Sequence, residues 1–291
     1  MREIHLTLVA ADGHPLAATA FEPAGRPVAA VQINGATGVP RRYYRAYAEF
    51  LAAQGFAVLT YDYRGIGGSR YRGHEARISM SHWGSHDLAA GLDWLDRQYP
   101  RLPVLTVGHS AGGQLLGLAA NNRRVVAALS IASQSGYWGL WPRTLQPVMA
   151  SLWYAVLPVT SKLLGRIPAG LMGAELPAGV ADEWARWCRN PHYISDRSGQ
   201  PIREHFHSYR GRMRFYAIGD DAFYAPLDAV TALAGFYRRA QTEVLRIEPA
   251  EHGLSRIGHF GFFRSGTPAA LWQQTADWLT GAARPALLQA A

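Results

Sequence analysis

Hydrophobic and polar positions follow two patterns that alternate along the chain. Continuous apolar runs, typical of buried parallel strands, cover residues 27–33, 56–61, 104–107 and 125–131. Apolar positions at helical spacing lie between or after them, over residues 41–54, 85–98 and 111–120. Strands that alternate with helices in this way predict an α/β protein with a parallel sheet and helices on both faces.

Further strands flank this alternating region. Two are predicted at Glu3–Ala10 and Pro15–Glu22, joined by a turn at Asp12-Gly13, and two more at Met213–Ile218 and Glu243–Ile247. A final helix is predicted over Ala269–Thr280, and the tail from Arg284 is expected to be loose. The total is eight strands in a mostly parallel sheet.

The alternation stops after Ser133. Residues 134–203 are rich in tryptophan and leucine and predict short helices broken by prolines. We therefore expect a sheet domain made of residues 1–133 and 204–285, with residues 134–203 inserted as a helical cap. Its aromatic residues predict either a lid over a binding pocket or a small core of the insertion itself.

Composition excludes several classes of protein. The 291 residues are 48% hydrophobic and 17% charged, which allows a full core and excludes a disordered chain. A single cysteine, Cys188, excludes a disulfide scaffold. The net charge of +8 comes from scattered arginines, which favours a solvated surface and no nucleic-acid partner.

No membrane or export segment is predicted. The longest apolar stretch, Pro147–Val159, is bounded by prolines and is shorter than the roughly 20 residues that a spanning helix needs. The opening residues alternate apolar and polar positions, unlike a secretory signal. We therefore expect a cytoplasmic protein with no integral membrane segment.

One motif carries clear chemistry. Residues Gly108-His109-Ser110-Ala111-Gly112 form a Gly-x-Ser-x-Gly sequence between a predicted strand and a predicted helix. A serine on a sharp strand-to-helix turn projects its hydroxyl above the sheet edge, and small residues are needed where the backbones crowd. Ser110 is therefore the candidate nucleophile.

With this motif, the chain resembles the α/β-hydrolase superfamily. The turn Asn34-Gly35-Ala36, the loop Asp62–Ser69 and the motif around Ser110 follow the superfamily's order, before an acid and a histidine near the C-terminus. Within the superfamily it is similar to a bacterial group related to serine aminopeptidases and monoacylglycerol lipases. The resemblance implies the α/β-hydrolase fold and a Ser–acid–His triad.

The resemblance also implies an oxyanion hole made of backbone amides. One amide belongs to Ala111, directly after the nucleophile, and the other to the loop after the third strand. Ala36 is the expected second donor, with Gly35 and Thr37 as alternatives in the same loop.

The acid and the base each have two candidates. Relatives often have Gly-x-x-Asp-x-x-x-Pro after the strand at 213–218, whereas this chain reads Gly219-Asp220-Asp221-Ala-Phe-Tyr-Ala-Pro226. Asp221 is nearer to that spacing, and Asp220 is the alternative. His259, between two glycines, is favoured as the base, and His252 is the alternative.

A hydrophobic pocket near these residues is also expected. The candidates for its wall are Asn34, His109, Trp138, Trp141, Phe223, Tyr224 and Phe260. His82 and His86 lie four residues apart but have no matching carboxylate, so no metal site is predicted. No cofactor-binding motif is found either.

These residues together predict a serine hydrolase. The expected partner is a small acyl substrate, a carboxylic ester with a hydrophobic acyl or alcohol part, and the sequence does not indicate the oligomeric state. Acyl transfer, thioester cleavage and small-peptide hydrolysis are alternatives that use the same triad. A ligand receptor on a hydrolase scaffold is the non-enzymatic alternative.

Overall fold

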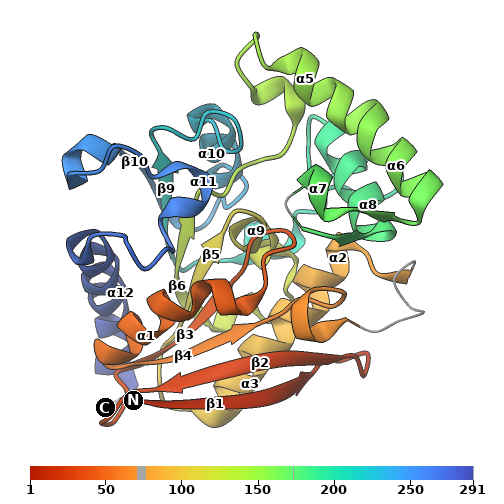
Figure 1. Ribbon diagram of the computed structural model, residues 1–291. Coiled ribbons are helices and arrows are strands. Elements are labelled where there is room, and N and C mark those ends of the chain that lie inside the picture. Colours follow the sequence, from red (N-terminus) through yellow and green to blue (C-terminus); the bar gives the residue numbers. More distant parts are fainter. Residues whose placement is uncertain (71–76, 173, 291) are drawn as a thin grey trace.

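A mixed, mostly parallel sheet forms the centre of the protein (Figure 1). The computed structural model describes residues 1–70, 77–172 and 174–290. Residues 71–76, within the predicted sheet domain, and residue 173, within the predicted cap, lie outside the described residues, as does Ala291 of the tail.

The sheet has eight strands in the described part of the chain, as predicted. They are β1 (Arg2–Val9), β2 (Pro15–Glu22), β3 (Ala29–Asn34), β4 (Phe56–Tyr61), β5 (Val104–His109), β6 (Val125–Ile131), β9 (Arg212–Ile218) and β10 (Gln241–Ile247). Their spatial order is β1-β2-β4-β3-β5-β6-β9-β10, and β2 alone runs antiparallel to its neighbours. All residues of β3, β4 and β5 are buried, which explains their continuous apolar runs.

Helices cover both faces of this sheet (Figure 1). Those of the sheet domain are α1 (Arg45–Ala53), α2 (Met80–His82), α3 (Ala89–Gln98), α4 (Ala111–Gln114), α9 (Glu204–Ser208), α10 (Leu227–Ala234), α11 (Gly258–Gly261) and α12 (Ala269–Ala290). Helices α1 and α12 pack together on one face, and α3 packs against β3 and β4 on the other.

Three expectations about these helices were wrong. The predicted helix 111–120 is only α4, followed by a 3-10 turn over Leu115–Leu118, where Gly117 packs closely against Phe206. The predicted helix 85–98 begins earlier, at Met80, and passes through a π-helical segment over Trp83–Leu88. The tail expected to be loose continues α12 as far as Ala290.

The segment between β6 and β9 contains a second group of elements. They are α5 (Gln146–Ser151), α6 (Leu157–Leu164), β7 (Arg166–Ile167), α7 (Ala169–Met172), β8 (Leu176–Pro177) and α8 (Ala178–Arg189). Figure 1 shows α5, α6 and α8 gathered at one end of the molecule, away from the β1–β2 hairpin.

The prolines of this segment do not break its first helix, contrary to expectation. Gln146–Leu164 is one run of 19 helical residues in which α5 and α6 are joined by a π-helical segment over Leu152–Val156. Pro147 lies in the first turn of this run, where a missing N–H disturbs little. Pro158 lies in its interior, directly after the π-helical segment. By length and composition this helix is apolar enough to cross a membrane, but one such helix is weak evidence of a span.

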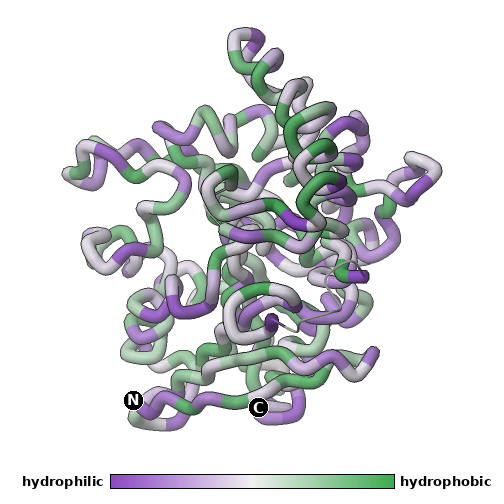
Figure 2. Tube along the Cα trace, turned by 45° about the vertical axis from the view of Figure 1, so that its right-hand side comes forward, coloured by the Kyte–Doolittle hydropathy of each residue, from purple (hydrophilic) through white to green (hydrophobic). Residues whose placement is uncertain are grey.

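Much of this helix is exposed. Several large apolar side chains on it are open to solvent, namely Val148, Tyr154, Val159, Leu163 and Leu164. Figure 2 shows the corresponding hydrophobic segments along the helix at the top of the view.

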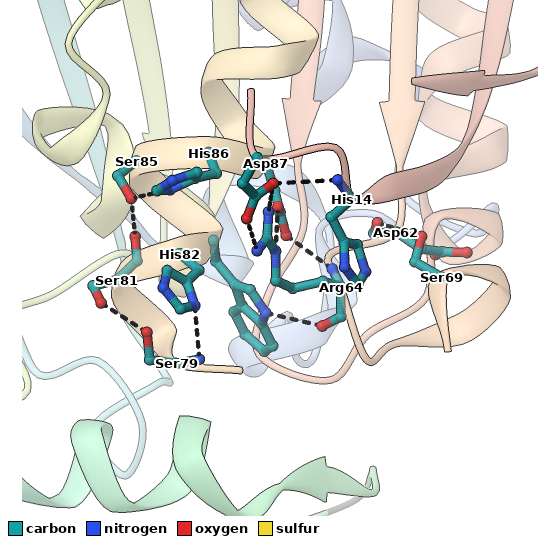
Figure 3. A network of polar contacts seen from close by, with 12 residues as sticks. His14, Asp62, Arg64, Ser69, Ser79, Ser81, His82, Ser85, His86 and Asp87 are labelled. Atoms are coloured by element: carbon teal, nitrogen blue, oxygen red, sulfur yellow. Dashed lines mark hydrogen bonds and ion pairs between the residues drawn. The ribbon is translucent and has the colours of Figure 1, made fainter. Parts of the chain in front are cut away.

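The loop after β4 is held by ion pairs of the buried Arg64 (Figure 3). The Nε atom and the backbone amide of Arg64 donate to the Asp87 carboxylate at 2.7 and 2.9 Å, and Trp83 Nε1 donates to the Arg64 carbonyl. The other end of the guanidinium donates to Asp12 in the β1–β2 turn at 2.6 and 3.1 Å. Arg64 therefore ties the first hairpin to the π-helical segment.

The two carboxylates around Arg64 have opposite pKa shifts. Hydrogen bonds from Arg64 lower the pKa of Asp12 to about 2. Burial raises the pKa of Asp87 to about 7, although Arg64 acts in the opposite direction.

The Asp12–Arg64 ion pair predicts acid-sensitive stability. Because the pKa of Asp12 is lowered on folding, its stabilisation is complete above the ordinary value of 3.8 and is lost as pH falls through about 2. Asp12→Asn should therefore lower the melting temperature near neutral pH, and the difference from wild type should vanish towards pH 2. Thermal unfolding across this range, with the exposed Asp182→Asn as control, measures it, and a constant difference would contradict it.

Candidate active site

Ser110 occupies a strained turn between β5 and α4. Its backbone has φ 51° and ψ −116°, a combination that non-glycine residues rarely adopt. The Ser110 amide donates to the carbonyl of Ile131 at 3.0 Å, and its carbonyl accepts from Gly113 at 3.1 Å. The sharp turn predicted for the nucleophile is therefore present and is held from both sides.

The glycines around Ser110 allow backbones to cross closely. A Cβ atom on Gly108 would lie 2.4 Å from the Gly113 nitrogen, and one on Gly112 would lie 2.0 Å from the Asn34 carbonyl oxygen. Neither contact can be relieved by moving a flexible side chain, because both atoms belong to the backbone. Because Gly112 has no side chain, the turn at Ser110 packs directly against the backbone at the end of β3.

Asp221 and His259 meet although 38 residues separate them. His259 Nδ1 lies 2.6 Å from Asp221 Oδ2, and both side chains are buried. Since the carboxylate can only accept when ionised, His259 donates from Nδ1 and keeps its lone pair on Nε2. The Tyr224 ring stacks on the imidazole at a centroid distance of 4.7 Å and so holds its orientation.

The alternative acid and base lie elsewhere. Asp220 accepts hydrogen bonds from the amides of Ile257 and Gly258 at 3.1 and 2.8 Å, so it braces the segment that leads into α11. His252 lies in a half-exposed position in the 3-10 turn Pro249–His252. The geometry therefore favours Asp221 and His259 as the pair.

The predicted oxyanion donors differ in their surroundings. Ala111 begins α4, where the first amides of a helix have no partner within the helix. The Ala36 amide instead donates to the Tyr44 hydroxyl at 2.7 Å. Its single hydrogen is thus engaged within the protein, which leaves Gly35 and Thr37 as the alternatives on this loop.

Two residues expected at the pocket wall belong to the framework instead. Asn34 is buried, and its side-chain oxygen accepts from Gln32 Nε2 at 2.8 Å and from the Tyr61 hydroxyl at 3.0 Å. His109 is fully buried and hydrogen-bonds to Tyr44 and to the His259 carbonyl. Nothing in the local sequence indicates the role of Tyr44, because its partner His109 lies 65 residues further along the chain.

An apolar cavity of about 670 Å³ lies between the 134–203 segment and the loops of the sheet domain. Of the expected wall residues, Trp141, Phe223, Tyr224 and Phe260 line it, together with Met149, Leu152, Trp153, Val156 and Trp184. Trp138 instead packs against Tyr137 and Tyr154. Because Tyr224 and Phe260 also contact the His259 ring, the cavity and the Asp–His pair share a wall.

Among the described residues, no group of three or more His, Cys, Asp or Glu side chains is arranged to hold a metal ion. The two histidines spaced four residues apart have neighbours in sequence as partners. His82 Nδ1 accepts a hydrogen bond from the Ser79 amide, and His86 Nδ1 is hydrogen-bonded to the Ser85 hydroxyl (Figure 3).

The strand order, the strained serine after β5 and the Asp–His pair define an α/β-hydrolase. The chain belongs to the family described as serine aminopeptidase, S33, whose match covers residues 26–196. It is 29% identical to monoglyceride lipase of Rattus norvegicus over 172 residues, which is 57% of this chain and 54% of the rat protein. It is 32% identical to monoglyceride lipase of Homo sapiens over 116 residues, 40% of this chain and 38% of the human protein. The chain thus spans about half or less of these relatives.

Solved structures share the fold over nearly the whole chain. A brefeldin A esterase superposes with a TM-score of 0.62 at 19% identity, covering 99% of this chain and 78% of that one. A lipase in its open form superposes with a TM-score of 0.63 at 18% identity, covering 97% and 99%. At these identities the likeness concerns the fold.

The crossing at Gly112 predicts a steep loss of stability on substitution. Gly112→Ala places a methyl group against the Asn34 carbonyl, so β3 and the turn at Ser110 must separate, at a cost of about 3 kcal/mol of folding free energy or more. Gly281→Ala on α12 meets no atom within 4 Å and should stabilise by up to about 1 kcal/mol. Chemical denaturation of both variants measures the contrast, and equal effects would refute it.

Proposed function

We propose that the protein is a serine hydrolase that cleaves carboxylic esters with a hydrophobic acyl or alcohol part. The observation that carries this proposal is the apolar cavity whose aromatic wall, Tyr224 and Phe260, also packs against the His259 ring. The same wall that binds an apolar chain would thereby place its ester beside the base. The names of the relatives, monoglyceride lipases, agree with such substrates.

The proposed reaction begins at Ser110. Its hydroxyl attacks the ester carbonyl while His259 Nε2 takes the proton, and the Asp221 carboxylate stabilises the imidazolium formed. The negative charge on the tetrahedral oxygen is held by the Ala111 amide and by the amide of either Gly35 or Thr37. His259 then returns the proton to the leaving alcohol, and water, activated in the same way, releases the acid from Ser110.

The 134–203 segment acts in this proposal as a cap. Met149, Leu152 and Trp153 of the helix Gln146–Leu164 face the cavity, and Trp141 is fixed by a hydrogen bond from its indole Nε1 to the Phe223 carbonyl at 2.8 Å. Apolar surface on both sides of the cavity favours a chain of carbon atoms over a charged or strongly polar group.

Aryl esters of increasing acyl length test the proposal. Wild-type protein should prefer medium or long chains because they fill the cavity, and Ser110→Ala should lose about 10⁴-fold or more in kcat/KM. Thioester, amide and acyl-acceptor assays run beside them would reveal the other reactions open to this triad. Folded protein without serine-dependent turnover on any of these substrates would overturn the proposal.

The cavity can be tested by narrowing it. Met149→Trp should lower kcat/KM for long-chain esters by roughly tenfold or more while sparing short-chain ones, because Met149 is buried in the cavity wall. Leu163→Trp is the matched control, since Leu163 lies on the same helix but is 75% exposed. Equal effects of both variants on all chain lengths would show that the chain binds elsewhere.

The two aspartates should differ in their contributions. Asp221→Asn removes the partner of His259 Nδ1 and should lower kcat by about 10³- to 10⁴-fold. Asp220 accepts from Ile257 on one oxygen and from Gly258 on the other, so Asp220→Asn keeps one of these two hydrogen bonds. Because the His259 partner is untouched, the loss of kcat should stay within about tenfold. Steady-state kinetics of both variants measure this difference. A larger loss of kcat in Asp220→Asn than in Asp221→Asn would make Asp220 the catalytic acid.

A further inference from the structure

A buried chain of hydrogen bonds connects the oxyanion loop with the base. The Ala36 amide donates to the Tyr44 hydroxyl at 2.7 Å, and this hydroxyl lies 2.9 Å from His109 Nδ1. His109 Nε2 lies 2.9 Å from the carbonyl oxygen of His259. These hydrogen bonds therefore connect the loop after β3 to α11 through His109, the residue directly before Ser110.

The polarity of this chain has only one solution. A carbonyl oxygen can only accept, so His109 carries its proton on Nε2 and donates to His259. A backbone amide can only donate, so the Tyr44 oxygen accepts from Ala36 and turns its own proton to His109 Nδ1. Every donor then meets an acceptor when His109 is neutral, and burial lowers the pKa of His109 well below its ordinary value.

Packing holds the same residues in place. Tyr44 and His109 are 1% and 0% exposed, and the Phe263 ring contacts both, at centroid distances of 5.0 and 4.9 Å. Gly35 lies against the Tyr44 ring, since a Cβ atom there would be 3.0 Å from Tyr44 Cε2. The oxyanion loop therefore rests directly on Tyr44.

The neighbouring tyrosine makes a parallel connection. The Tyr43 hydroxyl donates to the carbonyl of Phe260, directly after His259. Two consecutive tyrosines of the 3-10 turn Arg41–Tyr44 thus hold two consecutive carbonyls of α11, one directly and one through His109.

We propose that Tyr44 and His109 are positioning residues, which set the oxyanion loop and His259 at a fixed separation across Ser110. This rests on the proposed function of Ser110 and His259. Neither residue is among those that line the apolar cavity. Loosening the bridge should therefore misplace the catalytic groups without changing substrate binding, and small misplacements of this kind cost up to about 100-fold in rate.

The test compares two tyrosine hydroxyls. Tyr44→Phe deletes the central hydroxyl of the bridge but keeps the ring. Tyr47→Phe is the matched control, because Tyr47 is equally buried and its hydroxyl bonds to Thr275 at 2.7 Å, outside the bridge. We expect Tyr44→Phe to lower kcat roughly 10- to 100-fold with KM within about twofold, and Tyr47→Phe to leave both within about twofold.

Reaction with an alkyl fluorophosphonate separates this inference from the proposed function. The reagent bonds phosphorus to the Ser110 oxygen and releases fluoride, so its rate needs no knowledge of the natural substrate. Wild-type protein that is not labelled at Ser110 would overturn the proposed function. Labelled wild type with an equally fast Tyr44→Phe variant would overturn the bridge alone.

Substitutions at His109 provide the second arm. His109→Gln keeps a neutral donor and acceptor, whereas His109→Leu keeps neither, so glutamine should retain more of the labelling rate. Because both residues act through one chain, Tyr44→Phe in the His109→Leu background should cost no more than about twofold further. Independent, multiplying losses in the folded double variant would contradict the bridge.

Discussion

The backbone crossing beneath Ser110 is the constraint on which the site depends. The carbonyl of Asn34 at the end of β3 occupies the space where a side chain on residue 112 would stand. Two residues before this contact, Ser110 has a backbone conformation that a serine adopts only under strain, and hydrogen bonds to Ile131 and Gly113 hold it there. The turn at Ser110 and the end of β3 are therefore packed directly against each other.

The remaining groups are brought to this crossing from the ends of other strands. Asp221 follows β9, and His259 lies on the short helix α11 after β10, where Asp220 braces the incoming chain. Hydrogen bonds through Tyr44 and His109 then join that helix to the loop after β3. A rigid sheet with short connections at one edge can thus hold groups that are far apart in sequence.

The apolar cavity depends on a different part of the chain. The helix Gln146–Leu164 turns some apolar side chains towards the aromatic wall and leaves others, such as Leu163, open to solvent. This helix continues past Pro158, which directly follows the π-helical segment, and Pro147 lies in its first turn. This side of the cavity is therefore formed by a helix that contains a π-helical segment.

The local sequence pattern alone identified the buried strands and the turn at Ser110. The apolar runs identified the buried strands, because a strand covered on both faces needs no polar residues, and Gly-x-Ser-x-Gly identified the turn, because the crowding there admits only small side chains. Tertiary structure decided the rest. In the folded chain Asp221, and not Asp220, is hydrogen-bonded to His259, and the Ala36 amide donates to Tyr44. Asn34 and His109 are buried and hydrogen-bonded within the protein, although the sequence had suggested them for the pocket wall. Those outcomes rest on hydrogen bonds between residues up to 150 positions apart, and the composition of neighbouring residues carries no record of such partners.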